Sequence, residues 1–251
     1  MKKFLFVGKV YPEESGLTIK EILVEDLTGL LGNDNHKLRI EILNSIIRAE
    51  LETDAPLDLP TARNSVEYFI SGLVDAYGYY SGSAFDVRLS FGIGPEGEFT
   101  FPPVINEIAK DKVARPLQPE RLIVLSAKFP KLHRALSDLR EAIKHPMDTS
   151  FYCFRLTEAI RQHFVNKNQK DEAKAKRESW DEMGKSLLFE KSFKDELEKE
   201  AKYTRHGDVK DLTSEDIMRL LKKVWILLDR FVIYLNDGQR ELNQRMFKML
   251  K

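Results

Sequence analysis

Residues 213–236, TSEDIMRLLKKVWILLDRFVIYLN, decide how the second half of the chain folds. Apolar side chains recur there at spacings of three and four, which places them along one face of an α-helix. The stripe consists of Ile217, Leu220, Leu221, Val224, Leu228, Phe231 and Leu235. A helix with one apolar stripe buries it against other helices, so we predict a helical bundle with Leu228 in its core.

The start and the opposite face of this helix carry further signals. Thr213 and Asp216 stand three residues apart, as in a capping box, where a hydroxyl and a carboxylate satisfy free backbone amides. The opposite face combines basic and apolar side chains, namely Arg219, Lys222, Arg230, Ile226 and Ile233. Such a face is either a partner surface or an ordinary solvated surface, because scattered exposed apolar residues are common.

The rest of residues 119–251 also has helical periodicity. We predict helices near 119–128, 130–144, 149–166, 171–188 and 191–206. Pro130 and Pro146 fall at the junctions between these segments, where a residue without an N–H is best tolerated. The charged stretch 167–177, KNQKDEAKAKR, is either a solvated loop and helix start or a nucleic-acid contact.

The first half of the chain alternates between strand and helix patterns. We predict strands at 3–10 and 85–93, one long or bulged strand at 36–53, a helix from Thr61 to near Gly78, and a hairpin partner at 99–101. The stretch 109–120, AKDKVARPLQPE, is aperiodic and predicts a linker. The expected fold class is therefore α+β, with a mixed α/β domain at 1–115 and a helical bundle at 119–251.

Charge is distributed unevenly although the whole chain has a formal net charge of zero. Residues 1–118 contain 12 Lys and Arg against 18 Asp and Glu, a net charge of −6. Residues 119–251 contain 28 against 22, a net charge of +6. The basic half is suited to an anionic partner such as nucleic acid, or it docks on its own acidic half, or it is merely solvated.

Other composition features exclude several classes. The N-terminal apolar run is too short for a signal peptide or a membrane span, so we expect a soluble, cytoplasmic protein without a membrane partner. The single cysteine, Cys153, fits a reducing compartment and is expected to be buried. The five histidines lack metal-ligand spacing, so we expect neither a metal nor another cofactor. Residues 183–186, MGKS, resemble the end of a phosphate-binding loop, but Ser179 stands where that motif needs glycine.

The most suggestive polar stretch is 198–208, EKEAKYTRHGD, in which a helix runs into Arg205, His206 and Gly207. One interpretation is structural, because Arg and His suit the negative end of a helix and Gly suits its stop. The other is functional, because an arginine holds phosphate and an imidazole moves protons near neutral pH. His163 shares a helical face with apolar residues, which favours a half-buried core histidine.

Two stretches resemble the HEPN (higher eukaryotes and prokaryotes nucleotide-binding) superfamily of helical bundles, found in bacterial defence and toxin proteins. They are 151–164, FYCFRLTEAIRQHF, and 203–207, YTRHG, which precedes the long apolar helix. The resemblance covers roughly residues 148–237 and implies an RNA partner. Active members cut RNA without metal, using an Arg-x4–6-His motif shared between the two subunits of a dimer.

This motif is broken in the present chain. If His206 is the catalytic histidine, the arginine should stand at 199, 200 or 201, where the chain has Lys, Glu and Ala. The formal match from Arg140 to His145 is expected by chance. The resemblance then implies Arg205 and His206 as catalytic residues, with Arg155, Arg161 and His163 binding substrate from the opposite side.

Two functions of different classes follow from these observations. The first is a HEPN-like protein that binds RNA and cleaves it by metal-free attack of a 2′-hydroxyl on the adjacent phosphate. The second is a non-catalytic interaction or scaffolding module, in which the C-terminal helices form a homodimer or dock a protein partner. The broken motif favours the second, whereas His206 followed by a glycine favours the first.

Overall fold

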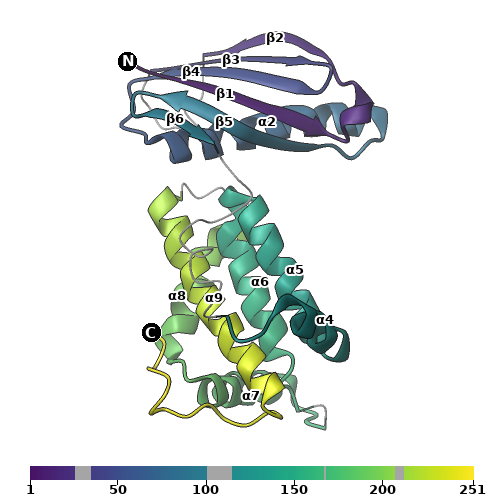
Figure 1. Ribbon diagram of the computed structural model, residues 1–251, viewed down its shortest axis with the longest axis vertical. Coiled ribbons are helices and arrows are strands. Elements are labelled where there is room, and N and C mark those ends of the chain that lie inside the picture. Colours follow the sequence, from purple (N-terminus) through teal and green to yellow (C-terminus); the bar gives the residue numbers. More distant parts are fainter. Residues whose placement is uncertain (26–34, 101–114, 167, 207–211) are drawn as a thin grey trace. The chain divides into compact units, whose positions relative to one another are not determined.

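The computed structural model describes residues 1–25, 35–100, 115–166, 168–206 and 212–251. The chain divides into two compact units, Met1–Val104 and Ile105–Lys251 (Figure 1). The first is built on an antiparallel sheet and the second is helical, so the predicted α+β class is confirmed. The first half of the predicted linker, 109–114, lies outside the described residues. Residues 115–118 belong to neither helix nor strand, and the last two residues of the predicted linker, Pro119 and Glu120, begin a helix.

The first unit contains a six-stranded sheet with the strand order β2-β3-β4-β1-β5-β6. The strands are β1 (Lys2–Tyr11), β2 (Ile19–Val24), β3 (His36–Leu43), β4 (Ile46–Thr53), β5 (Asp86–Gly94) and β6 (Gly97–Thr100). Each neighbouring pair is antiparallel. A short 3-10 turn, η1 (Glu13–Ser15), follows β1.

One helix, α2 (Leu59–Ser81), covers one face of this sheet (Figure 1). The strands alternate between buried and exposed residues, as expected when a sheet buries only one face. Phe4 and Phe6 of β1 and Ile40 of β3 pack with Ile70 of α2 in the core. The opposite face of the sheet carries charged and partly exposed apolar side chains.

Three differences from the sequence-based expectation concern this unit. The predicted strand at 36–53 is two strands, because Asn44 and Ser45 adopt positive φ angles of 49° and 65° and form a two-residue hairpin turn. Strand β2 was not predicted. Helix α2 continues past Gly78 and stops at Gly82, whose φ of 69° suits a residue without a Cβ.

The second unit is a bundle whose helices agree closely with the predicted ranges. They are α4 (Pro119–Lys128), α5 (Pro130–Lys144), α6 (Thr149–Arg161), α7 (Glu172–Leu187), α8 (Lys191–Arg205) and α9 (Ser214–Asn236), with a 3-10 turn, η3 (Pro146–Asp148), before α6. The main difference is that α6 ends at Arg161 rather than near 166.

Helix α6 is central to this bundle and packs against α5, α7, α8 and α9. The apolar stripe of α9 is buried, with Leu228 only 3% exposed, and the capping box of Thr213 and Asp216 is present. Cys153 is buried, and burial raises the pKa of its thiol. Within the described part of the chain, no helix is long and apolar enough to cross a membrane.

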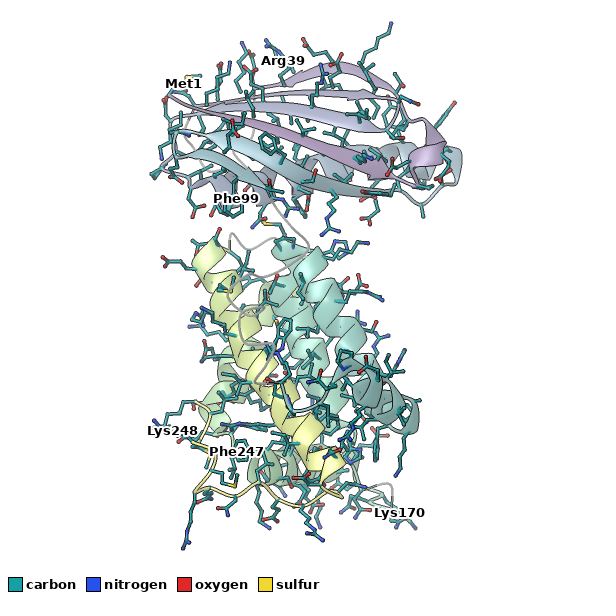
Figure 2. The ribbon with its side chains drawn as sticks, viewed as in Figure 1. Met1, Arg39, Phe99, Lys170, Phe247 and Lys248 are labelled. Carbon is teal, nitrogen blue, oxygen red and sulfur yellow. The ribbon has the colours of Figure 1, made fainter. Side chains whose placement is uncertain are left out.

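The opposite face of α9 is not the free basic surface that its sequence suggests. Arg230 is buried and donates hydrogen bonds to the carbonyl groups of Leu187, Leu188 and Lys248. It thereby holds the end of α7 and the C-terminal tail, which carries Phe247 and Lys248 (yellow in Figure 1, labelled in Figure 2). Arg219 forms ion pairs with carboxylates of α8 and α9.

Candidate functional site

The first half of α6 presents aromatic and basic side chains together, and two neighbouring elements add to them. We call this cluster the α6 outer face, and it consists of Phe151, Tyr152, Arg155, His145 and Arg205. Phe151, Tyr152 and Arg155 lie within one helical turn, His145 precedes η3, and Arg205 ends α8. All five side chains are at least partly exposed.

Arg155 occupies the middle of the α6 outer face. The centre of its guanidinium lies 5.3 Å from the ring centroids of both Phe151 and Tyr152, which is within cation–π range. Its Nη2 also donates to Oδ1 of Asp138 on α5 at 2.8 Å. Arg155 was predicted to bind substrate, and the structure places it on an exposed surface with two rings beside it.

Arg205, at the end of α8, lies beside the same part of α6. Its guanidinium stands 4.9 Å from the ring centroid of Phe154, which is one helical turn from Phe151. The hydroxyl groups of Ser150 and Thr204 are 3.2 Å apart and join the end of α8 to the start of α6. Among residues described by the structure, no carboxylate forms an ion pair with Arg205, so its charge faces solvent.

His206 follows Arg205 and is exposed. Its backbone N–H donates to the carbonyl group of Tyr203 at 2.9 Å, which closes the last turn of α8. No hydrogen bond to its imidazole is found within the described ranges. Gly207, which the motif requires next, lies outside the described residues. The structure therefore places Arg205 and His206 together at the end of α8, and both Arg205 and Arg155 lie beside aromatic rings of α6.

Arg161 and His163 lie elsewhere. Arg161 is buried about 10 Å further along the axis of α6 than Phe154, and it donates to Oε2 of Glu158 at 2.7 and 3.0 Å. Its Nη1 donates to the hydroxyl of Ser179 at 2.9 Å. These bonds occupy the arginine in the interior, away from the α6 outer face.

His163 is half-buried beyond the end of α6. Its Nε2 lies 3.0 Å from the accepting Oε1 of Gln239, and its ring packs edge-on against Phe231 and Tyr234. Burial lowers the pKa of this imidazole, while the bond to Gln239 opposes that effect. The arrangement agrees with a core histidine that has one satisfied nitrogen.

The formal motif match from Arg140 to His145, which is expected by chance, joins two residues that both contact Glu141. Both Nε and Nη2 of Arg140 donate to Oε1 of Glu141, at 2.9 and 2.6 Å, and this bonding lowers the pKa of the carboxyl group. The other oxygen of Glu141 lies 3.4 Å from Nε2 of His145, whose ring stacks on Tyr152. The spacing from Arg140 to His145 was visible in the sequence, but only the helix geometry shows that both side chains reach one carboxylate.

A groove of about 280 Å³ runs beside the α6 outer face, between α5 and α6. It is lined by Pro130, Lys131, Arg134, Asp138, Arg155, Glu158, Ala159 and Gln162. Asp138 is only 2% exposed and lies between two arginines, with Nε of Arg134 at 3.3 Å from Oδ2 and Nη2 of Arg155 at 2.8 Å from Oδ1. Burial raises the pKa of Asp138, and Arg134 opposes this shift.

Neither of the other sequence signals forms a site. Residues 183–186 lie inside α7, so the glycine and lysine there do not form a phosphate-binding loop. Across the ranges that the structure describes, no group of three or more His, Cys, Asp or Glu side chains is arranged to hold a metal ion.

Comparison with known proteins matches each half of the chain to one family model. Residues 4–101 match the N-terminal domain of DUF8168 and residues 119–236 match its C-terminal domain, both described as domains of unknown function. No curated protein and no solved structure matches the chain significantly. The two matches follow the order of the two compact units, so the chain is similar over both halves to the two-domain DUF8168 family.

Proposed function

We propose that the helical unit binds single-stranded RNA through the α6 outer face. The observation that carries this proposal is that Arg155 lies over the rings of Phe151 and Tyr152, while Arg205 lies over the ring of Phe154 in the same part of α6. Unpaired bases stack on aromatic rings and on guanidinium planes, and arginine also contacts the phosphates between the bases. Phe151 and Tyr152 are partly exposed beside Arg155, so this surface offers both interactions.

The charge of the unit and the family resemblance support the same ligand. Residues 119–251 carry a net charge of +6, which favours a polyanion at low salt. The resemblance of 151–164 and 203–207 to HEPN sequences implies an RNA partner, and these two stretches contribute Phe151, Arg155 and Arg205. Resemblance and geometry therefore favour the same residues.

Metal-free RNA cleavage is the catalytic form of this proposal. The 2′-hydroxyl would attack the adjacent phosphate while the bond from phosphorus to the 5′-oxygen breaks, which gives a 2′,3′-cyclic phosphate and a free 5′-hydroxyl. His206 would take the proton of the 2′-hydroxyl, and Arg205 would stabilise the charge that develops on the phosphate oxygens. The exposure of His206 beside Arg205 supports this assignment. His145, which lies beside Tyr152, is our candidate for the group that gives a proton to the leaving 5′-oxygen.

Binding is tested by fluorescence anisotropy with a labelled pyrimidine RNA of about 12 nucleotides, a length typical of single-strand sites. Phe151→Ala should weaken binding by roughly 5- to 100-fold, since stacking on a ring contributes about 1–3 kcal/mol per base. Arg205→Ala should weaken binding and lower the slope of log K against log salt by about one. If RNA affinity falls with salt but neither Phe151→Ala nor Arg205→Ala weakens binding, the proposal is contradicted.

A matched control separates this surface from nonspecific charge. Arg177 on α7 is also exposed, and no ion pair to it is found in the described parts of the chain. Arg177→Ala should change the affinity by less than about twofold, because distant surface charge acts only through the screened field. If Arg177→Ala and Arg205→Ala weaken binding equally, RNA is held instead by the general charge of the unit or by the charged stretch 167–177.

Cleavage is tested on the same RNA in the presence of a metal chelator. His206→Ala should reduce the cleavage rate by about 10²-fold or more while leaving RNA affinity within about twofold, because a proton-transfer group acts mainly on the chemical step. If the wild-type protein binds RNA but does not cut it, the function is binding alone.

A second candidate function is a non-catalytic interaction module, and α4 is the observation that favours it. This helix has no buried residue, and it exposes Ile123 and Val124 to 67% and 70%. Two adjacent apolar side chains of this kind suit a contact between two copies of the chain. Light scattering should then show a dimer that Ile123→Glu converts to a monomer, whereas a wild-type monomer would exclude this contact.

A further inference from the structure

The groove between α5 and α6 has a charge pattern that the α6 outer face does not explain. Three cations line it, Lys131, Arg134 and Arg155, against two carboxylates, Asp138 and Glu158. Glu158 is already neutralised by two hydrogen bonds from Arg161, which approaches from the interior of the bundle. Asp138 alone therefore balances the three lining cations, which leaves an excess of two positive charges.

Asp138 holds Arg134 and Arg155 in place but does not use all of their N–H donors. Arg134 approaches Asp138 through Nε and Arg155 bonds it through Nη2, while a guanidinium carries five N–H donors. Asp138 is nearly inaccessible, so it acts as a positioning residue that fixes both guanidinium groups at the groove wall. Arginines fixed in this way present paired donors that match the oxygens of a phosphate group.

Size and charge together define the ligand. A volume of about 280 Å³ lies near the lower end of the range for small-molecule sites, which suits one nucleotide rather than a strand. A phosphate monoester carries a charge of about −1.5 to −2 at neutral pH, close to the excess of two positive charges. An internal phosphodiester carries only one negative charge and continues as a chain on both sides.

We propose that the α5–α6 groove binds a phosphate monoester, supplied either by the phosphorylated end of an RNA strand or by a free nucleoside monophosphate. Arg155 connects the two sites, because it lines the groove and also lies over Phe151 and Tyr152 on the α6 outer face. The RNA source rests on the RNA-binding function proposed above, whereas the free monophosphate does not.

The experiment compares ligands that differ only in the phosphate. The RNA arm uses one RNA sequence with a 5′-phosphate, a 3′-phosphate or hydroxyl groups at both ends. The mononucleotide arm uses adenosine 5′-monophosphate against adenosine, with binding followed by calorimetry on the full chain. We expect the phosphorylated ligand of at least one arm to bind about 10-fold tighter than its hydroxyl counterpart, the effect of about one strong charged hydrogen bond.

Two variants locate the effect. Arg134→Gln should abolish the preference for phosphate and leave the affinity for hydroxyl-ended RNA unchanged, because Arg134 lies outside the α6 outer face. Its side chain is 56% exposed, so the variant should fold. Arg140→Gln is the control, since Arg140 is 70% exposed on the same helix, does not line the groove and pairs with Glu141. It should retain the full preference.

The outcomes separate this proposal from the RNA-binding function. If RNA does not bind but adenosine 5′-monophosphate does, and Arg134→Gln removes that binding, the groove proposal stands without the RNA function. Equal binding of phosphorylated and hydroxyl ligands in both arms overturns the groove proposal and leaves RNA binding intact. A phosphate preference that survives Arg134→Gln also overturns it, because the phosphate would then lie elsewhere.

Discussion

The open face of the sheet and the α6 outer face are both exposed and both mix charged with apolar residues, but they arrange their charges differently. On the sheet, cations lie opposite carboxylates on neighbouring strands. Lys3 of β1 pairs with Glu50 and Glu52 of β4, and Arg39 of β3 lies 3.6 Å from Glu21 of β2. Figure 2 shows Arg39 projecting from the face opposite α2.

On the α6 outer face, the cations lie beside aromatic rings. Arg205 has only the ring of Phe154 beneath it among the described residues, and Arg155 shares its single carboxylate, Asp138, with Arg134. On a surface of paired charges, the cations and carboxylates already bind each other and water. An arginine that lies over an aromatic ring keeps most of its N–H donors available for a ligand. The comparison shows that net charge per half does not locate a binding surface, because the pairing of each charge decides whether it is available.

The largest expected effect concerns the core of the helical unit that carries the α6 outer face. Leu228→Ala should cost about 2–5 kcal/mol of the free energy of unfolding, because it leaves a cavity in the bundle core. Ile226→Ala on the same helix should cost less than about 0.5 kcal/mol, since Ile226 is 45% exposed. Urea unfolding followed by tryptophan fluorescence reports on this unit, because Trp180 and Trp225 both lie in it. Equal costs would show that α9 is packed differently.

The second effect contrasts two arginines of α6. Arg161→Met should cost about 2–4 kcal/mol in the same unfolding assay, because it removes both hydrogen bonds to the largely buried Glu158. Arg155→Met should cost at most about 1 kcal/mol, since Asp138 keeps Arg134, but it should weaken RNA binding. A stable Arg161→Met protein with weakened RNA binding would instead support the substrate-binding role that the sequence suggested for Arg161.

The third effect lies beneath the sheet, where a carboxylate is buried rather than exposed. Glu67 of α2 accepts hydrogen bonds from Arg63 and from the backbone of Leu89, and burial raises its pKa from 4.5 to about 7. Between these two pH values the folded unit binds a proton that the unfolded chain does not, so its stability should fall as pH rises. The expected change is about 1–3 kcal/mol across this window.

The pH effect is measured by hydrogen exchange of the sheet amides, expressed as protection relative to unprotected amides at the same pH. Glu67→Gln should remove the pH dependence, because an amide of the same shape does not titrate in this range. An equal slope in Glu67→Gln would assign the pH dependence to another group of the unit.

The smallest effect concerns the open face of the sheet itself. Lys3→Gln and Arg39→Gln should each change the free energy of unfolding by less than about 0.5 kcal/mol, because exposed ion pairs contribute little. Both variants should also leave RNA affinity within about twofold, as expected for paired charges. A loss of RNA binding comparable to that of Arg205→Ala would end the distinction between the two surfaces.

Helix positions in this protein were determined by local sequence. The range of α5 was predicted to the residue, because Pro130 can begin a helix and its apolar period continues to Lys144. The apolar stripe of α9 predicted the burial of Leu228, because apolar residues three and four positions apart share one face of a helix. Strand β3 was not separated from β4, because only the hairpin geometry at Asn44 and Ser45 interrupts an otherwise continuous β-branched stretch.

The candidate site was determined by the sequence only in part. Residue types and a family resemblance selected Arg155 and Arg205, but they selected Arg161 equally, and packing places Arg161 in the interior. No sequence signal pointed to Arg134 or Asp138, and it is the packing of α5 on α6 that buries Asp138. Helical periods depend on neighbours three or four residues apart, whereas a ring beneath a guanidinium depends on residues 51 positions apart, and only tertiary packing brings those together.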